Sequence, residues 1–352
     1  MMAEFQRHPG FRFAPSGLQT GGDAIQIRGT LAKLTRRAVV GGLAGLAAGK
    51  ACAEPDWPAR TITIIHGFAA GGPSDVVARL VADGLSRALG QSVIVEPRPG
   101  ASGTTAAAQI ARATPDGYTL GVIPSGHATA AATFARLPFR PIDDFTMITI
   151  CSDYPYLMAT NADSGIKSVA ELIKAAKTRP TPMLYGTPGV GSGPQLAIEL
   201  FALKTKLKFQ HIPFKGSEPA ATELVAGRLD FMMDPPSSLI GFVRSGRLNA
   251  LAVSSAKPYF ALPQTPSVGE TVPGFDVSAW QGLIAPAGLP DPIVRRLNAE
   301  TVRILKDPET RERMYAFGNE PCPTTPEEFR KRLADDIALW SDVAEQIHFE
   351  KI

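Results

Sequence analysis

The chain has 352 residues, of which 44% are hydrophobic and 20% charged, a composition that suits a soluble globular protein of one large or two medium domains. Its formal net charge is +3, but residues 1–53 hold seven of the 36 basic and two of the 33 acidic residues, so 29 basic and 31 acidic residues follow them. A charge balance so close to zero gives no reason to expect a nucleic acid or an anionic membrane surface as a partner.

Residues 1–53 are expected to be an N-terminal extension that ends in an export signal. Arg36 and Arg37 precede an apolar core of 11 residues, Ala38–Ala48. Such a core is too short for a membrane span, which needs about 20 residues, but it is typical of a signal peptide. The competing interpretation is a tail followed by a short buried helix.

The end of this segment predicts where it is cleaved. Ala51-Cys52-Ala53 has the small-x-small pattern, so the mature chain is expected to begin at Glu54, in the periplasm. The arginine pair and the glycine-rich core favour the twin-arginine route, with the Sec route a close alternative. Acylation of Cys52 is a weaker alternative.

Cys151 and Cys322 are the two thiols that follow the predicted cleavage point. They could pair in an oxidising compartment, but their separation alone does not establish a disulfide. Two unpaired, buried cysteines are the favoured interpretation. The spacing of cysteines and histidines does not predict a metal site, and no cofactor is expected.

From residue 57 onward, apolar runs alternate with glycine-rich turns and amphipathic segments. The run "TITIIHGF" predicts a strand, and Pro73–Leu89 predicts a helix that Gly90 closes. The next strand is "SVIVEP", followed by an alanine-rich helix near Thr104–Ala113 and by a turn and strand in "PDGYTLGVI". This alternation predicts an α/β fold with a mostly parallel sheet covered by helices on both faces.

The middle of the chain repeats this scheme and predicts a second sheet. Expected strands are "TMITICSD", "YLMATN", "MLYGT", "FQHIPF", "LDFMMD" and "LNALAVSS", with helices between them, and the C-terminal segment is expected to be helical. So many strands exceed one sheet of usual size. We therefore expect two lobes, one formed by residues 54–155 plus 280–352 and an inserted one formed by residues 156–279.

Two glycine-rich loops occupy the place where α/β sheets bind ligands, after the carboxyl end of a strand. They are Phe68–Gly72 and Thr187–Gly193, and they lead directly into Pro73 and Pro194, residues suited to the first helical turn. Each loop therefore presents backbone N–H groups at the positive end of a helix, where a carboxylate or phosphate binds. The alternative is that the glycines only make tight turns.

Signatures of enzymes are missing from the sequence. It contains no dinucleotide fingerprint, no phosphate-binding P-loop, no nucleophile elbow and no zinc-protease motif. His66, His127 and His211 are scattered, and a histidine in such a place is more often packed than catalytic. The runner-up function is an exported α/β enzyme, such as a serine hydrolase that uses Ser192 or Ser102, which would require a base beside the serine.

Two acidic residues have both a structural and a functional interpretation. Asp75 lies in the first turn of a predicted helix, where it offsets the helix dipole, but it could also fix a water or a ligand amino group. Asp234 ends a buried strand before two prolines, where it could line a cleft or cap the next turn.

Seven segments, taken together, identify a family. The chain closely resembles the substrate-binding receptors of tripartite tricarboxylate transporters, the Bug-type periplasmic solute receptors, over residues 57–347. The segments are "WPARTITIIHGFAAGGPSDVVAR", "PRPGASGTTAAAQIARATPDGYTL", "LPFRPIDDF", "YGTPGVGSGPQLAIELF", "HIPFKGSEPAATELVAGRLDFMMD", "GRLNALAVSSAKPYFALPQTPSVGE" and "WQGLIAPAGLPDPIVRRLN".

The resemblance implies a two-lobed periplasmic-binding-protein fold of type II, a Venus flytrap. Such a receptor is not an enzyme: it closes on a small carboxylate, such as a di- or tricarboxylate, an aromatic acid or an acidic amino acid, and delivers it to a membrane permease. The protein is expected to be a monomer.

The family's loops grip the carboxylate through backbone amides and waters, which implies a set of binding residues here. Asp75 would orient water or select the ligand, and Ser125 and His127 would face its distal end. The full set is Phe68, Ala69, Ala70, Gly71, Gly72, Asp75, Ser125, His127, Thr187, Gly189, Ser192 and Asp234.

Three departures from the family pattern affect these expectations. His66-Gly67 stands where relatives usually have Val-Pro, which leaves one more backbone N–H in the first loop. Arg140 stands where an acid is common, and small residues at 125–132 replace the usual Asn-Pro pair. Unusual ligand preference is therefore expected first at the first loop and at the distal end.

Overall fold

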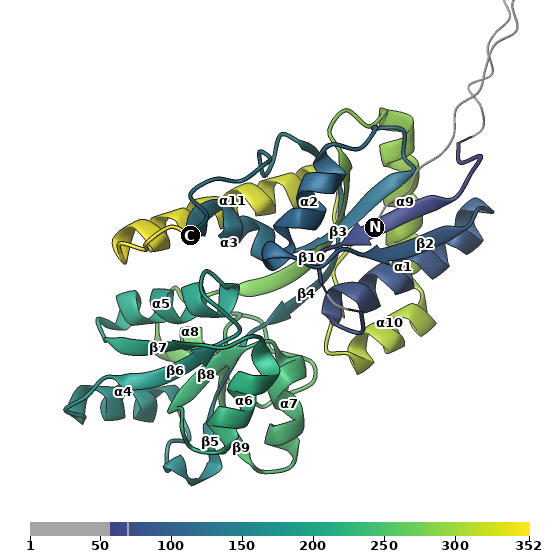
Figure 1. The fold of residues 1–352 in the computed structure, drawn as a ribbon. Coiled ribbons are helices and arrows are strands. Elements are labelled where there is room, and N and C mark those ends of the chain that lie inside the picture. The colour runs from purple at the N-terminus through teal and green to yellow at the C-terminus, as the bar shows by residue number, and fades with distance from the viewer. Residues whose placement is uncertain (1–56, 69) are drawn as a thin grey trace, which may run out of the picture. The chain divides into compact units, whose positions relative to one another are not determined.

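The computed structural model describes residues 57–68 and 70–352 (Figure 1). The predicted export signal, its cleavage at Ala53 and the binding residue Ala69 lie outside the described residues. Within them, no helix combines the length and apolar character needed to cross a membrane, and no group of three or more acidic, histidine or cysteine side chains is placed to hold a metal ion.

The first sheet has six strands in the order β11-β4-β10-β3-β1-β2. The strand β1 pairs in parallel with β2 and β3, whereas β10 is antiparallel to both of its neighbours and β11 is antiparallel to β4. The strand bounds are β1 Ile62–His66, β2 Val93–Pro97, β3 Thr119–Pro124, β4 Phe145–Pro155, β10 Ser278–Pro286 and β11 Glu320–Pro321.

The second sheet has five strands in the order β7-β6-β8-β5-β9. The strand β6 is parallel to β7 and β8, and β5 is antiparallel to β8 and β9. Their bounds are β5 Leu157–Asn161, β6 Met183–Thr187, β7 Phe209–Pro213, β8 Phe231–Asp234 and β9 Leu248–Val253.

Helices cover both faces of each sheet (Figure 1). On the first sheet, α1 packs with α9 on one face and α3 packs with α11 on the other; on the second, α6 packs beside α7. The bounds are α1 Pro73–Leu89, α2 Thr104–Ala111, α3 Gly126–Thr133, α4 Val169–Thr178, α5 Gly193–Thr205, α6 Ser217–Val225, α7 Pro236–Arg244, α8 Val268–Thr271, α9 Asp291–Lys306, α10 Pro308–Ala316 and α11 Pro326–Gln346. Two short 3₁₀ turns, Ala101–Gly103 and Ala162–Ser164, complete the set.

The α/β class with two sheets is confirmed, but the prediction that each sheet is mostly parallel is wrong. Both sheets are mixed, because strands that pass from one sheet to the other enter antiparallel to their neighbours. The strand β10 and the helix α3 were not predicted. Helix α3 is buried on most sides and built of small residues, so it has no apolar stripe to reveal it.

The chain changes sheet twice, once between β4 and β5 and once between β9 and β10. Ser254 joins the two crossing segments: its hydroxyl accepts from the amide of Tyr156 at 2.7 Å and donates to the carbonyl of Val277 at 2.6 Å. The lobe limits expected from the sequence, after residues 155 and 279, stay a prediction.

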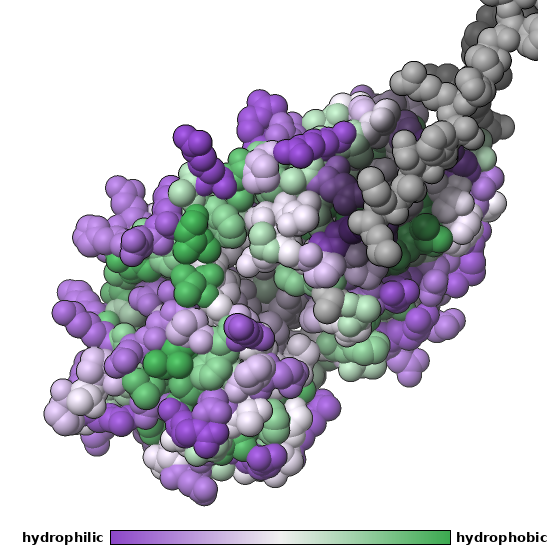
Figure 2. Space-filling view, in the orientation of Figure 1, coloured by the Kyte–Doolittle hydropathy of each residue, from purple (hydrophilic) through white to green (hydrophobic). Residues whose placement is uncertain are grey.

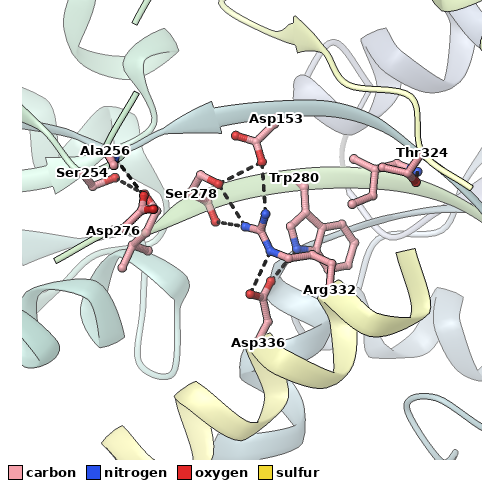
Figure 3. A network of polar contacts seen from close by, with 11 residues as sticks. Asp153, Ser254, Ala256, Asp276, Ser278, Trp280, Thr324, Arg332 and Asp336 are labelled. Carbon is pink, nitrogen blue, oxygen red and sulfur yellow. Dashed lines mark hydrogen bonds and ion pairs between the residues drawn. The ribbon is translucent and has the colours of Figure 1, made fainter. Parts of the chain in front are cut away.

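Arg332 of α11 ties this crossing region to the first sheet (Figure 3). Its guanidinium donates to Asp336 at 3.0 Å and to the hydroxyl of Ser278 at 3.0 Å, and it lies 3.6 Å from Asp153. Trp280 of β10 donates its indole N–H to the second oxygen of Asp336 at 2.6 Å. Through these contacts, α11 holds the end of β4 and the start of β10, which lie next to the two segments that connect the sheets.

The two cysteines are unpaired, as favoured from the sequence. Cys151 is buried in β4, whereas Cys322 is only partly buried. Burial raises the pKa of the Cys151 thiol to about 12, which keeps it protonated and unreactive.

Candidate ligand-binding site

A cleft of about 240 Å³ lies where strand ends of the two sheets face each other. The first sheet contributes residues that follow β1 and β3 and the end of β4, and the second sheet contributes those that follow β6 and β8. A hollow between the two parts of the surface is visible in Figure 2. This is the position at which α/β sheets bind ligands.

The second glycine loop forms one wall of the cleft. Residues 188–194 all line it, and Gly189 and Gly191 adopt φ angles of 153° and 75°, which favour glycine. Thr187 itself is fully buried. Its hydroxyl lies 2.6 Å from Nε2 of His211 and 3.1 Å from the carbonyl of Gly189, so Thr187 shapes the loop from behind.

The side chains at the start of α5 fix the end of this loop. Gln195 accepts the Gly191 amide at 2.7 Å, and Ser192 caps the helix by accepting the Gln195 amide at 3.4 Å. A side chain on Gly193 would place its Cβ 2.2 Å from the hydroxyl of Tyr156. The Gly193 backbone is therefore open to the cleft only because this residue is glycine.

The first glycine loop is held by charged groups. The amide of Gly71 donates to Oδ2 of Asp75 at 2.9 Å, and Arg79 donates to the same oxygen at 2.8 Å. The other oxygen, Oδ1, lies 3.0 Å from Nε2 of His66, which is fully buried at the end of β1. Burial alone would raise the pKa of Asp75, but the hydrogen bonds from Arg79, Gly71 and His66 together bring it below its usual value.

The predicted binding residues of the first loop differ in whether they line the cleft. Phe68 lines the cleft, whereas Ala70, Gly71, Gly72 and Asp75 do not. Both carboxylate oxygens of Asp75 have protein partners and the residue is 3% exposed. In this conformation Asp75 shapes the loop, and the Gly71 amide is already taken.

Gly67, which stands where relatives usually have proline, allows two backbone segments to pack closely. A Cβ on Gly67 would lie 2.4 Å from the Cα of Gly103, so the two backbones touch at this point. Gly103, in turn, lies under the ring of Phe68. The turn at 101–103 therefore sets the position of Phe68 at the edge of the cleft.

Ser125 and His127, predicted together, are separated by the structure. Ser125 lines the cleft at the start of α3. His127 points away: its Nε2–H donates to the carbonyl of Pro141 at 2.8 Å, and its ring stacks on Phe139 with centroids 5.2 Å apart. Burial lowers the pKa of His127 to about 4, so the ring is neutral and serves packing.

Asp234 lies behind the cleft and not on its surface. It is fully buried, and Oδ2 accepts from the hydroxyl of Ser238 at 2.6 Å, while Oδ1 has no hydrogen-bond partner among the described residues. Burial raises the pKa of Asp234 to about 7. Pro235, the next residue, does line the cleft.

Several residues of the cleft were not predicted from the sequence. Tyr154 and Tyr156 lie at the crossing between the sheets, and Thr129, Ala130 and Phe134 come from α3 and its end. The two tyrosines flank Pro155 at the expected lobe limit after residue 155, which was the available signal. Helix α3 gave none because its pattern is not amphipathic.

The described residues that line the cleft include no lysine, arginine, histidine, aspartate or glutamate. Burial raises the pKa of Tyr154 to about 12 and raises that of Tyr156 as well, so both phenols are neutral. Any charged group in this cleft must therefore be stabilised by neutral hydroxyls, backbone amides and helix ends.

The serines considered as nucleophiles have no basic partner among the described residues. The Ser192 hydroxyl caps α5, and Ser102 is exposed with a φ of 54°. His66, His127 and His211 contact Asp75, Pro141 and Thr187. The geometry gives neither serine the general base that nucleophilic catalysis requires.

Comparison with known proteins places this arrangement in context. Residues 77–349 match the family model described as "Tripartite tricarboxylate transporter family receptor". Protein BugT of Bordetella pertussis is 32% identical over 294 residues, which cover 82% of this chain and 90% of that protein.

Two solved structures have the same fold. The chain is similar to R. palustris Rpa4515 with adipate (32% identity, TM-score 0.76, covering 84% of this chain and 100% of that one). It is also similar to MatC from Rhodopseudomonas palustris with bound malate (33% identity, TM-score 0.71, covering 82% and 99%). The periplasmic-binding-protein fold expected from the sequence is confirmed.

Proposed function

The chain belongs to the tripartite tricarboxylate transporter receptor family, and from this premise we propose that it carries a small organic carboxylate to a permease of that transporter class. In this proposal the protein is exported, loses residues 1–53 and acts as a monomer. Its two lobes, residues 54–155 plus 280–352 and residues 156–279, close on the ligand.

The observation that carries the proposal is the neutral cleft at the second loop. Gly193, at the start of α5, and Gly126, at the start of α3, both line it, and among the described residues neither amide donates to a protein acceptor. A carboxylate between them would meet two helix N-termini and the hydroxyls of Ser125, Tyr156 and Ser192. Adipate and malate in the two structural relatives support the ligand class.

Closure of the lobes would complete the site. Water leaves the cleft as the lobes approach, and hydrogen bonds from amides to a carboxylate are stronger in a drier surrounding. The segments between β4 and β5 and between β9 and β10 are the places where such a motion would bend, since they connect the two sheets.

A thermal-shift screen of the purified protein tests this function. Di- and tricarboxylates, aromatic acids and acidic amino acids form one panel, and esters and amides form the other. At a hundredfold excess over its Kd, a true ligand adds about 2.7 kcal/mol to the free energy of unfolding, and the melting temperature should rise by roughly 4 °C or more. No shift with any acid, together with turnover of an ester or amide, would favour the hydrolase.

A matched pair of glycine variants locates the site. Gly193→Ala puts a Cβ 2.2 Å from the Tyr156 hydroxyl, whereas Gly241→Ala in α7 meets nothing within 4 Å. We expect Gly193→Ala to weaken binding of the best acid by at least about tenfold, with Gly241→Ala unchanged. Equal affinities in both variants would place the carboxylate elsewhere.

A further inference from the structure

The cleft has one polar corner. Ser125 at the start of α3, Tyr156 between β4 and β5, and Gly193 of α5 line it, and the Tyr156 hydroxyl approaches Gly193. This corner brings together two hydroxyls and an open backbone amide. The whole cleft has a volume of about 240 Å³, below the roughly 300–1,000 Å³ typical of ligand pockets.

The rest of the lining is largely apolar. Phe134 and Val190 flank the point where α3 meets the second loop: Thr133 precedes Phe134, Gly191 follows Val190, and a Cβ on Gly191 would lie 3.0 Å from the Thr133 hydroxyl. Phe68 adds an aromatic ring from the first loop. Val190 is 45% exposed, so its side chain is accessible to a ligand in the cleft.

A second carboxylate on this apolar side would have no counter-charge. The described lining residues contain no cation. Behind the wall that the second sheet contributes lies the buried carboxyl of Asp234, next to Pro235, which cannot serve as a counter-charge for an anion. Desolvating a carboxylate without a partner is costly, whereas an alkyl chain or aromatic ring gains from the same surface.

We propose that this receptor selects acids with a single carboxylate and an apolar body, an aryl or short alkyl monocarboxylate. The carboxylate lies at Ser125, Tyr156 and Gly193, and the body packs on Phe68, Phe134 and Val190. This inference rests on the proposed carboxylate-binding function, and it sets the chain apart from relatives described with adipate or malate.

Calorimetry with matched acids tests the preference. Hexanoate and adipate have six carbons each and differ in the second carboxylate, as do benzoate and terephthalate in the aromatic series. We expect each monocarboxylate to bind at least about tenfold more tightly than its dicarboxylate partner.

A positive charge introduced on the apolar side of the cleft should reduce the preference for the monocarboxylate over the dicarboxylate. Val190→Lys supplies the missing cation at an exposed position, so the ratio of hexanoate to adipate affinity should fall by at least about tenfold. Phe317→Lys is the matched control, because Phe317 is an exposed apolar residue (54%) outside the cleft lining. In Phe317→Lys, the ratio of hexanoate to adipate affinity should stay at the wild-type value.

The outcomes separate the inference from the function on which it rests. Equal or tighter binding of the diacids, or an unchanged ratio in Val190→Lys, would overturn the monocarboxylate preference and leave a carboxylate receptor in place. Failure of all four acids and of the wider acid panel to bind would overturn both.

Discussion

The two glycine loops use the same construction with different chemistry. In each, a glycine amide donates to the side chain four residues later, across the proline that starts the helix: Gly71 to Asp75 and Gly191 to Gln195. A histidine lies behind each loop, His66 against Asp75 and His211 against Thr187. The first loop is thus held by a carboxylate in a charged network, and the second by a neutral amide.

The charge of the side chain that holds each loop matches the position of that loop relative to the cleft. In the second loop, Pro188 and the five residues that follow it line the cleft. Among the described residues of the first loop, Phe68 alone lines it. A neutral acceptor beside the ligand site adds no negative charge that would repel a carboxylate. The carboxylate of Asp75 is tolerated because it lies outside the cleft lining, against His66 and Arg79.

The largest expected effect concerns the stability of the two loops. Asp75→Ala leaves His66 and the Gly71 amide without their buried partner, and should lower the free energy of unfolding by about 3 kcal/mol; Gln195→Ala removes one neutral bond and should cost about 1 kcal/mol. Urea unfolding of both variants measures this. Equal losses would show that the charge in the first loop adds nothing.

A smaller effect is expected where the second loop meets helix α3. Gly191→Val places a side chain 3.0 Å from the Thr133 hydroxyl at a φ of 75°, so it should displace the loop from α3 and weaken carboxylate binding by about tenfold. Gly165→Val is the control, with a φ of 72° and nothing within 4 Å of its Cβ. It shares the backbone strain, so comparable affinity loss in both variants would remove the steric explanation.

The last expected effect is on pH dependence. Burial lowers the pKa of His211 to about 4, below the value of about 6.5 in an unfolded chain. Between these values the unfolded chain binds the extra proton, so the free energy of unfolding falls as pH drops from about 6.5 to about 4. His211→Gln should flatten this part of the curve.

The first loop responds to pH differently. Burial also lowers the pKa of His66, but Asp75 opposes the shift, so His66→Gln should flatten the same range less than His211→Gln does. The carboxylate of Asp75 has a lowered pKa, and its stabilisation is lost only as pH falls below about 4. Identical profiles for the two histidine variants would contradict this distinction.

The sequence predicted the parts of this site that rest on local rules. Helix α1 was predicted with its observed bounds, and Gly90 closes it in the left-handed conformation. The second loop, which the sequence singled out by its glycines and proline after a strand, lines the cleft, and its binding role stays a prediction.

The remaining features depend on contacts that no local pattern encodes. Whether the Gly71 amide is free depends on the rotamer of Asp75 and on His66 behind it. His127 turns from the cleft because Phe139 and Pro141 receive its ring. Tyr156 enters the cleft because Ser254 fixes the crossing strand, a pairing across 98 positions.

A crystal structure of the protein with hexanoate tests the central claim most directly. The account predicts a closed cleft with the carboxylate oxygens within hydrogen-bond distance of the Gly193 amide and the Ser125 or Tyr156 hydroxyl, and with the alkyl chain on Phe134 and Val190. Hexanoate bound outside the space between the two sheets, or oriented with its carboxylate against Val190, would contradict it.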